Sequence, residues 1–270
     1  MSADVTRTAG FGAGPGGVAT ITVTASEEGW RANAHLLVLP TSVVLIDAPL
    51  LDRDAEVVER ELAAVGTPLA AVIVTHPHPD HFATAARFGA PVRALPAVAA
   101  AIEKSGAQQI AASYAVTGIS DAAPPAPRVE PTILPGPEVI DGVLFEFAEV
   151  EDAEASRQLV VRLPAEGILV AGDLVSAGVH PFLAGRALAS WRAGLDQLRT
   201  PAVRVLLPGH GIPASDGTAV IDATADYLRR AEPELAAASG PHDLDTRLDA
   251  AFPELGGRRM HALQNVFLFP

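Results

Sequence analysis

Short apolar runs separated by turn residues mark the first strands of the chain. Three such runs, rich in β-branched residues, lie at 18–26, 34–40 and 42–48. Residues 52–66 then carry apolar side chains at helical spacing and end at a glycine, and a further apolar run follows at 70–75. This order predicts a sheet with a helix packed against it.

The same order of elements recurs in the rest of the chain. We expect helices at 81–89, 97–116 with a break near Gly106, 185–200 and 215–238. We expect strands at 91–96, 132–136, 143–150, 157–164, 167–173 and 203–211. The proline-rich stretch 121–131 is predicted to be a loop. Two similar halves of this kind predict an α/β fold in which two mixed sheets pack face to face, with helices outside.

Composition and charge exclude several classes of function. The net charge is −13, with 32 acidic and 19 basic residues, so a nucleic-acid partner is not expected. The absence of cysteine excludes disulfides, thiolate metal ligands and a cysteine nucleophile. No apolar run reaches the roughly 18 residues that span a bilayer, and the N-terminus shows no export signal. We therefore expect a cytoplasmic protein with no membrane partner.

The segment THPHPDH, residues 75–81, contains three of the eight histidines. Pro77 and Pro79 exclude a regular helix, so these side chains come from a loop. The loop follows a buried strand, and in open α/β folds ligands bind at the carboxyl ends of the strands. The segment is therefore predicted to form a binding site, in preference to a proline-rich turn with incidental histidines.

The residue types in this loop indicate a metal site. Crowded imidazoles and a carboxylate shift one another's pKa values unless a cation binds them. Imidazole and carboxylate ligands suit Zn²⁺ and also Fe or Mn. His76 and His78 lie two residues apart, so they point the same way and can share one metal, while Asp80 and His81 face a neighbouring position. We expect one or two Zn²⁺ ions per chain, with Fe or Mn as alternatives.

These residues resemble the metallo-β-lactamase superfamily, whose signature is a strand followed by HxHxDH. The signature is matched by His76, His78, Asp80 and His81, and the resemblance extends from about residue 18 to residue 235. It also covers Asp47 at the end of a strand, the AGD turn at 171–173 and the PGHG segment at 208–211. The resemblance implies an αββα sandwich in which Asp173 bridges two metals and His210 completes the second site.

The same resemblance divides the chain. We expect a flexible N-terminus at 1–17, a metallo-β-lactamase-like domain at 18–238 and a C-terminal extension at 239–270 packed on that domain.

One histidine of the family pattern is missing. Its position, nineteen residues before Asp173, is occupied by Glu154. The third ligand of the first metal is therefore Glu154 or, after a small loop shift, Asp152. In the alternative interpretation Glu154 is a solvated acid and the first site is weak. A glutamate here resembles the alkylsulfatase branch, and its extra charge would make the metal pair less electrophilic.

Other polar residues have less specific roles. His180 is predicted to be catalytic, as a substrate contact or proton donor, or to replace a metal ligand, and the alternative is a loop histidine with a backbone partner. His35 is expected to be a satisfied strand histidine. Asp47 is expected to orient a metal ligand. His242 and His261 are assigned no chemistry.

Three functions fit these residues. The first is a metal-dependent hydrolase of a small ester, thioester, lactone or sulfate ester, with a metal-bound hydroxide as nucleophile and Asp80 as a catalytic group that handles the proton. The second is a mononuclear Fe(II) oxygenase of the persulfide-dioxygenase type. The third is a non-catalytic binding protein that kept the fold. In each enzyme the partner is a small-molecule substrate.

Overall fold

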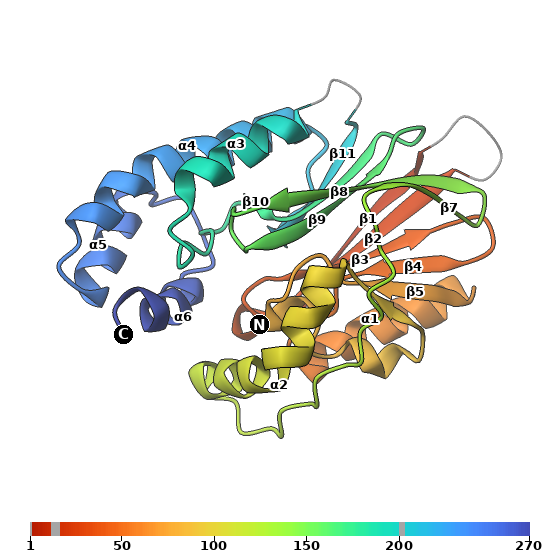
Figure 1. The fold of residues 1–270 in the computed structure, drawn as a ribbon, viewed down its shortest axis with the longest axis horizontal. Coiled ribbons are helices and arrows are strands. Elements are labelled where there is room, and N and C mark those ends of the chain that lie inside the picture. The colour runs from red at the N-terminus through yellow and green to blue at the C-terminus, as the bar shows by residue number, and fades with distance from the viewer. Residues whose placement is uncertain (1, 12–16, 200–202) are drawn as a thin grey trace.

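Two β-sheets lie face to face in the computed structural model, which describes residues 2–11, 17–199 and 203–270 (Figure 1). Among these residues the first sheet has the order β1 (Asp4–Phe11), β2 (Val18–Thr24), β3 (Asn33–Val38), β4 (Val43–Ile46), β5 (Leu69–Ile73) and β6 (Val92–Arg93). The second has the order β11 (Val205–Gly211), β10 (Ile168–Ala177), β9 (Arg157–Leu163), β8 (Val143–Glu151) and β7 (Gly136–Ile140). Both sheets are mixed, because β4–β5, β5–β6 and β10–β11 are parallel and the other pairs are antiparallel.

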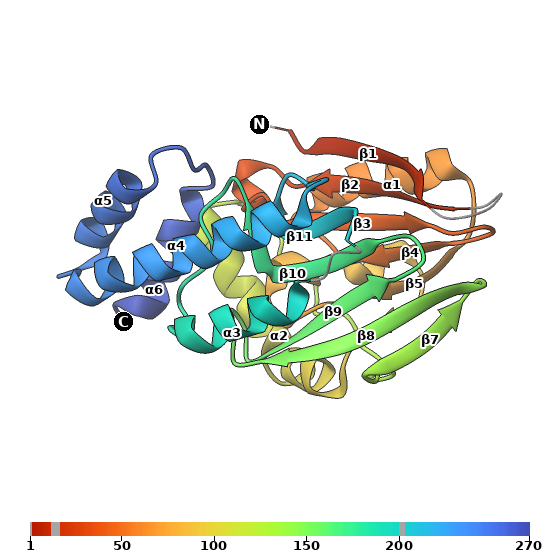
Figure 2. The ribbon, with the colours of Figure 1, turned by 90° about the horizontal axis from the view of Figure 1, so that it is seen from above.

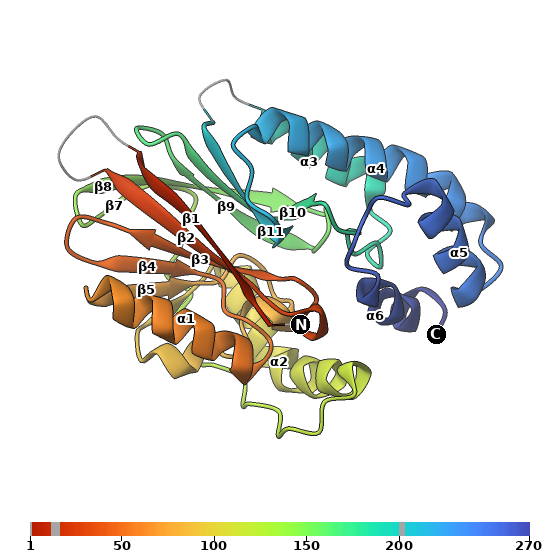
Figure 3. The same cartoon turned by 180° about the vertical axis from the view of Figure 1, so that it is seen from behind.

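Helices cover the outer faces of the two sheets, as Figures 1 and 3 show. On the first sheet lies α1 (Asp52–Val65), and α2 (Pro96–Thr117) lies at its end beside the site loops. The second sheet is covered by α3 (Leu188–Leu198) and α4 (Gly217–Ala237). The C-terminal helices α5 (Pro241–Ala251) and α6 (Arg259–Leu268) follow α4, and α6 contacts α2 (Figure 2). The predicted αββα arrangement is confirmed.

Apolar side chains along the strands of the second sheet point alternately to its two faces, so this sheet contributes to two separate cores. In β10 the side chains of Ile168 and Val170 join the core between the sheets, while Leu169 and Ala171 join the core under α3 and α4. The same alternation occurs in β9 and β11. Successive strand residues point to opposite faces, so a strand buried on both faces reads as a continuous apolar run.

The N-terminal segment differs from the prediction. Residues 4–11 were expected to be flexible, but they form β1, which pairs antiparallel with β2. Val5 packs against the core, and Arg31 forms an ion pair with Asp4 at 2.7 Å. The glycine-rich residues 12–16 of the predicted flexible segment lie outside the described residues.

Three elements in the middle of the chain also differ. The predicted helix at 81–89 is replaced by two short 3₁₀ turns, at Pro79–His81 and Ala85–Phe88. The predicted break at Gly106 is absent from α2, where a Cβ at Gly106 would lie 3.1 Å from Ile102, so this glycine serves close packing. The strand predicted at 132–136 lies instead at Gly136–Ile140, as β7.

Candidate metal centre

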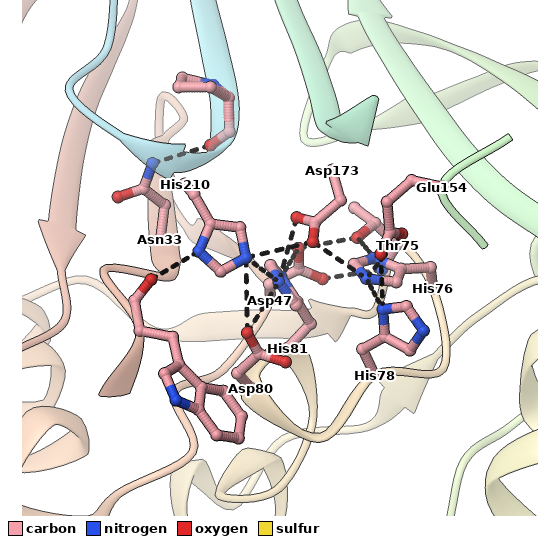
Figure 4. A network of polar contacts seen from close by, with 12 residues as sticks. Asn33, Asp47, Thr75, His76, His78, Asp80, His81, Glu154, Asp173 and His210 are labelled. Atoms are coloured by element: carbon pink, nitrogen blue, oxygen red, sulfur yellow. Dashed lines mark hydrogen bonds and ion pairs between the residues drawn. The ribbon is translucent and has the colours of Figure 1, made fainter. Parts of the chain in front are cut away.

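The predicted ligands meet between the two sheets, at the ends of their strands (Figure 4). The first sheet contributes the loop after β5, with His76, His78, Asp80 and His81. The second sheet contributes Asp173 from β10, His210 from β11 and Glu154 from the turn between β8 and β9. Their ligand atoms form two groups, His76–His78–Glu154–Asp173 and Asp80–His81–His210.

Three imidazoles are held by their Nδ1 atoms. His81 Nδ1 lies 2.9 Å from Asp47 Oδ2, and His210 Nδ1 lies 2.8 Å from the carbonyl oxygen of Trp30. A carboxylate and a carbonyl only accept hydrogen bonds, so both Nδ1 atoms carry the proton and donate. In each ring Nε2 is then the free atom that faces the centre.

His76 also carries its proton on Nδ1, and a longer chain of hydrogen bonds fixes it there. The Thr75 hydroxyl donates to Asp47 Oδ2 at 2.8 Å, so it can only accept from His76 Nδ1, which lies 3.0 Å away. The Thr75 backbone N–H donates to Asp47 Oδ1 at 2.7 Å. Asp47 therefore orients His81 directly and His76 through Thr75, and hydrogen bonds to the second ring nitrogen commonly orient metal-binding histidines in this way.

His78 and Glu154 face each other at the first group. His78 Nδ1 lies 3.1 Å from Glu154 Oε1, and the other carboxylate oxygen, Oε2, accepts from Gln158 Nε2 at 2.7 Å. Glu154 is 3% exposed, so it is not a solvated acid, whereas Asp152 is exposed and outside both groups. The structure therefore brings Glu154, and not Asp152, to the position of the missing histidine.

Asp173 lies between the two groups. Its Oδ2 is 3.5 Å from His76 Nε2 and 3.1 Å from His210 Nε2, and its Oδ1 is 3.1 Å from His81 Nε2. Asp80 Oδ2 approaches His210 Nε2 at 3.4 Å and His81 Nε2 at 3.6 Å. This placement matches the bridging position that the family resemblance implies for Asp173.

The donor set fits divalent cations. The Nε2 atoms of His81 and His210 face each other at 3.4 Å, an arrangement that is repulsive for two lone pairs and also for two N–H groups. Glu154 Oε1 and Asp173 Oδ1 are buried and make no hydrogen bond of regular geometry, although an imidazole nitrogen lies 3.1 Å from each, His78 Nδ1 and His81 Nε2 respectively. A cation between these atoms satisfies both the imidazole lone pairs and the carboxylate charge.

Without a cation, protons would take its place. Burial lowers the pKa of His78, but the Glu154 carboxylate beside it raises that pKa to about 9. Burial likewise lowers the pKa of His81, and Asp173, Asp80 and Asp47 together raise it well above its ordinary value. Burial would raise the pKa of Asp173, but His210, His81 and His76 hold it well below its usual range. Metal binding at this centre therefore displaces protons.

Backbone geometry fixes two of the carboxylates. Asp47 has φ of +61°, a left-handed conformation that turns its side chain back under Thr75. A Cβ at Gly209 would overlap Asp173 Oδ1 and lie 2.7 Å from the Asp173 backbone nitrogen. The glycine before His210 therefore lets β11 approach β10 at the centre.

A pocket of about 570 Å³ opens onto the centre. His78, Asp80, Glu154 and Asp173 are among the residues that line it. Its walls are mainly apolar and are provided by Trp30, Phe182, Ala112, Val116, Met260, Leu263, Val266 and Phe267. Several of these residues belong to α6, which the sequence did not predict.

The remaining predicted residues lie elsewhere. The structure does not bring His180 to the centre: its Nδ1 lies 3.0 Å from the Tyr227 hydroxyl, and its ring packs against His261. His35 is a satisfied strand histidine, with Thr22 and the Pro208 carbonyl at its two ring nitrogens, and burial lowers its pKa to about 4. Sequence reasoning missed the Trp30 carbonyl and Thr75, although Thr75 directly precedes the motif.

Fold and site together define an αββα protein with two adjacent groups of possible metal ligands between its sheets. The sequence profile of the metallo-beta-lactamase superfamily matches residues 28–210, and the chain belongs to this superfamily. A comparison with curated proteins found no match.

Solved structures show the same fold at low identity. The metallo-beta-lactamase from Pontibacter korlensis is 22% identical, with 84% of this chain and 99% of that chain covered and a TM-score of 0.62. A metallo-beta-lactamase family protein from Thermus thermophilus is also 22% identical, with 88% and 86% covered and a TM-score of 0.63. The DIM-1 metallo-beta-lactamase is 17% identical, with 86% and 99% covered and a TM-score of 0.61.

Within the described ranges, no helix combines the length and apolar character needed to cross a bilayer.

Proposed function

We propose that the chain is a metal-dependent hydrolase of a small ester, thioester, lactone or sulfate ester that carries an apolar group. The observation that carries the proposal is the convergence of three oriented imidazole Nε2 atoms and the buried carboxylates of Glu154 and Asp173 at an apolar pocket. Zinc is the metal we propose, and the cytoplasm is the proposed location.

The residues of the chain would share the work as follows. His76, His78, Glu154 and Asp173 would hold one ion, and Asp80, His81 and His210 the other, with Asp173 between them. When bound, such ions lower the pKa of water and stabilise the oxyanion that forms on attack. The apolar walls bind the apolar part of the substrate and exclude bulk water from the reacting carbonyl or sulfuryl group.

Asp80 has a position suited to proton transfer. Its carboxylate lines the pocket, and Oδ2 lies within 3.6 Å of His81 and His210. We propose that Asp80 takes the proton of the attacking water and delivers it to the leaving group.

One observation favours the oxygenase as a second candidate. His76, His78 and Glu154 form a set of two histidines and one carboxylate, which is the donor set of many non-haem Fe(II) oxygenases. The second group, Asp80–His81–His210, favours the hydrolase because a mononuclear enzyme does not require it. A single iron per chain together with oxygen consumption would support the oxygenase.

The test combines metal content with a substrate panel. The wild type, purified without added metal, is analysed for zinc, iron and manganese and assayed with an alkyl ester, thioester, lactone and sulfate ester. We expect at least two zinc ions per chain and hydrolysis of the member with the longer apolar group. A protein that binds no metal after dialysis against Zn²⁺, Mn²⁺ and Fe²⁺ would instead be a binding protein.

Glu154→Gln tests the unusual ligand directly. We expect this variant to lose one zinc relative to the wild type and to show at least a tenfold lower kcat/KM, because a neutral amide is a poor zinc ligand. Asp152→Asn, which changes an exposed residue of the same turn, is the matched control and should leave both unchanged. Equal zinc content in the wild type and Glu154→Gln would show that Glu154 is not a ligand.

A further inference from the structure

A second cluster of possible metal ligands lies away from the centre, where the C-terminal helices meet the body of the protein. His180 follows β10, Asp249 lies on α5 and His261 lies on α6. One ligand atom from each of these residues lies within 4.8 Å of the other two. His180 Nε2 is 3.8 Å from Asp249 Oδ1, and His261 Nδ1 is 4.0 Å from the same oxygen.

The two imidazoles are buried and incompletely paired. His180 is 1% exposed and His261 is 3% exposed, and neither Nε2 atom has a hydrogen-bond partner among the described residues. Their ring centroids are 4.4 Å apart. A buried polar atom without a partner is unfavourable, so His180 Nε2, which faces Asp249, indicates a missing ligand.

The remaining contacts suit metal binding by His180. Its Nδ1 lies 3.0 Å from the hydroxyl of Tyr227. When Nδ1–H donates to that oxygen, Nε2 keeps its lone pair and points toward Asp249. Burial lowers the pKa of His180 to about 4 and also lowers the pKa of His261, which favours the neutral form of both rings. The neutral imidazole is the form that coordinates a metal.

The backbone around the cluster is fixed independently of any ligand. The His180 backbone N–H donates to the Gly256 carbonyl at 3.1 Å, and the Gly256 N–H donates to the Gly178 carbonyl at 2.9 Å. These bonds hold the segment after β10 against the turn between α5 and α6. Donors around a tetrahedral zinc lie about 3.3 to 3.6 Å apart, so the two contacts with Asp249 Oδ1, at 3.8 and 4.0 Å, need to shorten by a few tenths of an ångström.

Charged neighbours define the site further. Asp245 Oδ1 lies 3.7 Å from His261 Nδ1 and also accepts from Asn265 at 2.8 Å, so it can serve as a fourth donor. Arg258 Nε lies 3.0 Å from Asp249 Oδ1, and its side chain is 55% exposed. Because this guanidinium is largely in solvent, it can turn away from the carboxylate when a cation binds.

We propose that His180, Asp249 and His261 form a further divalent-cation site, of the zinc type, that joins α5 and α6 to the segment after β10. The site is separate from the centre described above, because the two share no ligand. Its position has a consequence for the pocket: Met260 and Leu263, which flank His261 on α6, line the apolar wall. A bound ion would hold that wall in place.

Zinc content and zinc-dependent stability test the site. Wild type, His261→Gln, Asp249→Asn and the control His242→Gln are stripped with chelator and dialysed against micromolar Zn²⁺. His242 is an exposed histidine on α5 and is outside the cluster. We expect His261→Gln and Asp249→Asn to hold one zinc fewer than the wild type and to lose part of the zinc-induced rise in Tm. His242→Gln should match the wild type.

Amide hydrogen exchange gives a local readout that needs no turnover. Zinc should slow exchange in α6 of the wild type and His242→Gln, but not in His261→Gln or Asp249→Asn. Metal-free melting curves show whether the variants fold. If His261→Gln does not fold, the test rests on Asp249→Asn, which changes a partly exposed side chain. Equal zinc content and equal protection of α6 in all folded proteins would overturn the proposal, whether or not the protein hydrolyses any substrate.

Discussion

At the scale of residues, the centre depends on which nitrogen of each imidazole carries the proton. Asp47 determines this for two rings, because it accepts from His81 Nδ1 and from the Thr75 hydroxyl that in turn accepts from His76. Among the described residues, no other carboxylate contacts both His81 Nδ1 and the Thr75 hydroxyl. Metal affinity should therefore depend on a residue that does not itself touch the metal.

Asp47→Asn is expected to weaken metal binding. Asp47 Oδ2 accepts from both His81 Nδ1 and the Thr75 hydroxyl, and Oδ1 accepts from the Thr75 backbone N–H. The amide of asparagine can accept at only one of its two ends, so its NH₂ would face either the Thr75 N–H or the two donors at Oδ2, and the imidazoles would be held less firmly in the binding tautomer. We expect roughly a 10- to 100-fold loss of zinc affinity, measured by competition with a chelator.

The control is Asp54→Asn, which changes another buried carboxylate, bound to Ser26. This variant should lower Tm without changing zinc affinity. An Asp47→Asn protein that binds zinc as tightly as the wild type would show that Asp47 has only a structural role.

At the scale of elements, the centre depends on how closely β11 approaches β10. Gly209→Ala places a methyl group onto the Asp173 carboxylate, so either the strand or the carboxylate must move. Overpacking of this kind costs about 1–3 kcal/mol. We expect a lower unfolding midpoint in urea and the loss of at least one bound zinc.

Gly89→Ala provides the comparison for Gly209→Ala. Gly89 has φ of +67° and open space around its Cβ position, so alanine there costs backbone strain of roughly 1–2 kcal/mol without touching the centre. Its zinc content should equal that of the wild type. If both variants keep all their zinc, the close approach at Gly209 is not needed for metal binding.

Helices and strands whose apolar residues recur at a regular spacing could be predicted from the sequence, and elements shaped by long-range contacts could not. The strands from β2 to β5 and from β8 to β11 are apolar runs bounded by turns, and α1 has helical spacing. The 81–89 segment also has helical composition, but Ala48 N–H donates to the His81 carbonyl and Thr84 N–H to the Pro49 carbonyl. These bonds to a distant loop replace the helical ones.

The same distinction holds for the site. The ligands of the 75–81 loop are local in sequence, so the motif identified them, and counting from Asp173 located Glu154. The Trp30 carbonyl reaches His210 across 180 positions of sequence, and α6 adds the pocket wall from the far end of the chain. Contacts of this kind have no local pattern, because they arise only when the sheets pack.

At the scale of the whole molecule, titration of the centre should control the stability of the metal-free protein. The folded state raises the pKa of His78 to about 9, so it binds a proton that the unfolded chain, with a pKa near 6.5, has released. This contribution is complete below pH 6.5 and is lost as pH rises through about 9. Buried His35 and His180, with pKa values lowered to about 4, act oppositely and reduce stability below pH 6.5.

We therefore expect the metal-free protein to be most stable near pH 6.5. Above that pH each such proton contributes a decrease of up to about 1.4 kcal/mol per pH unit. Urea unfolding in chelator at several pH values between 5 and 9 measures the profile. Zinc should reverse the decline above pH 6.5, since its ligands must be deprotonated. A metal-free stability that rises from pH 6.5 to 9 would contradict the assignment.

The ligands of the centre come from both sheets, so a bound ion acts as a cross-link across the inter-sheet core. By thermodynamic linkage, metal binding then stabilises the packing of the two sheets, and weaker packing of the sheets lowers the metal affinity. A cavity opened beside Phe145, a fully buried residue of that core, would weaken binding of the ion without altering any ligand. Variation that looks remote from the chemistry can therefore tune how much metal the protein retains when the supply is scarce.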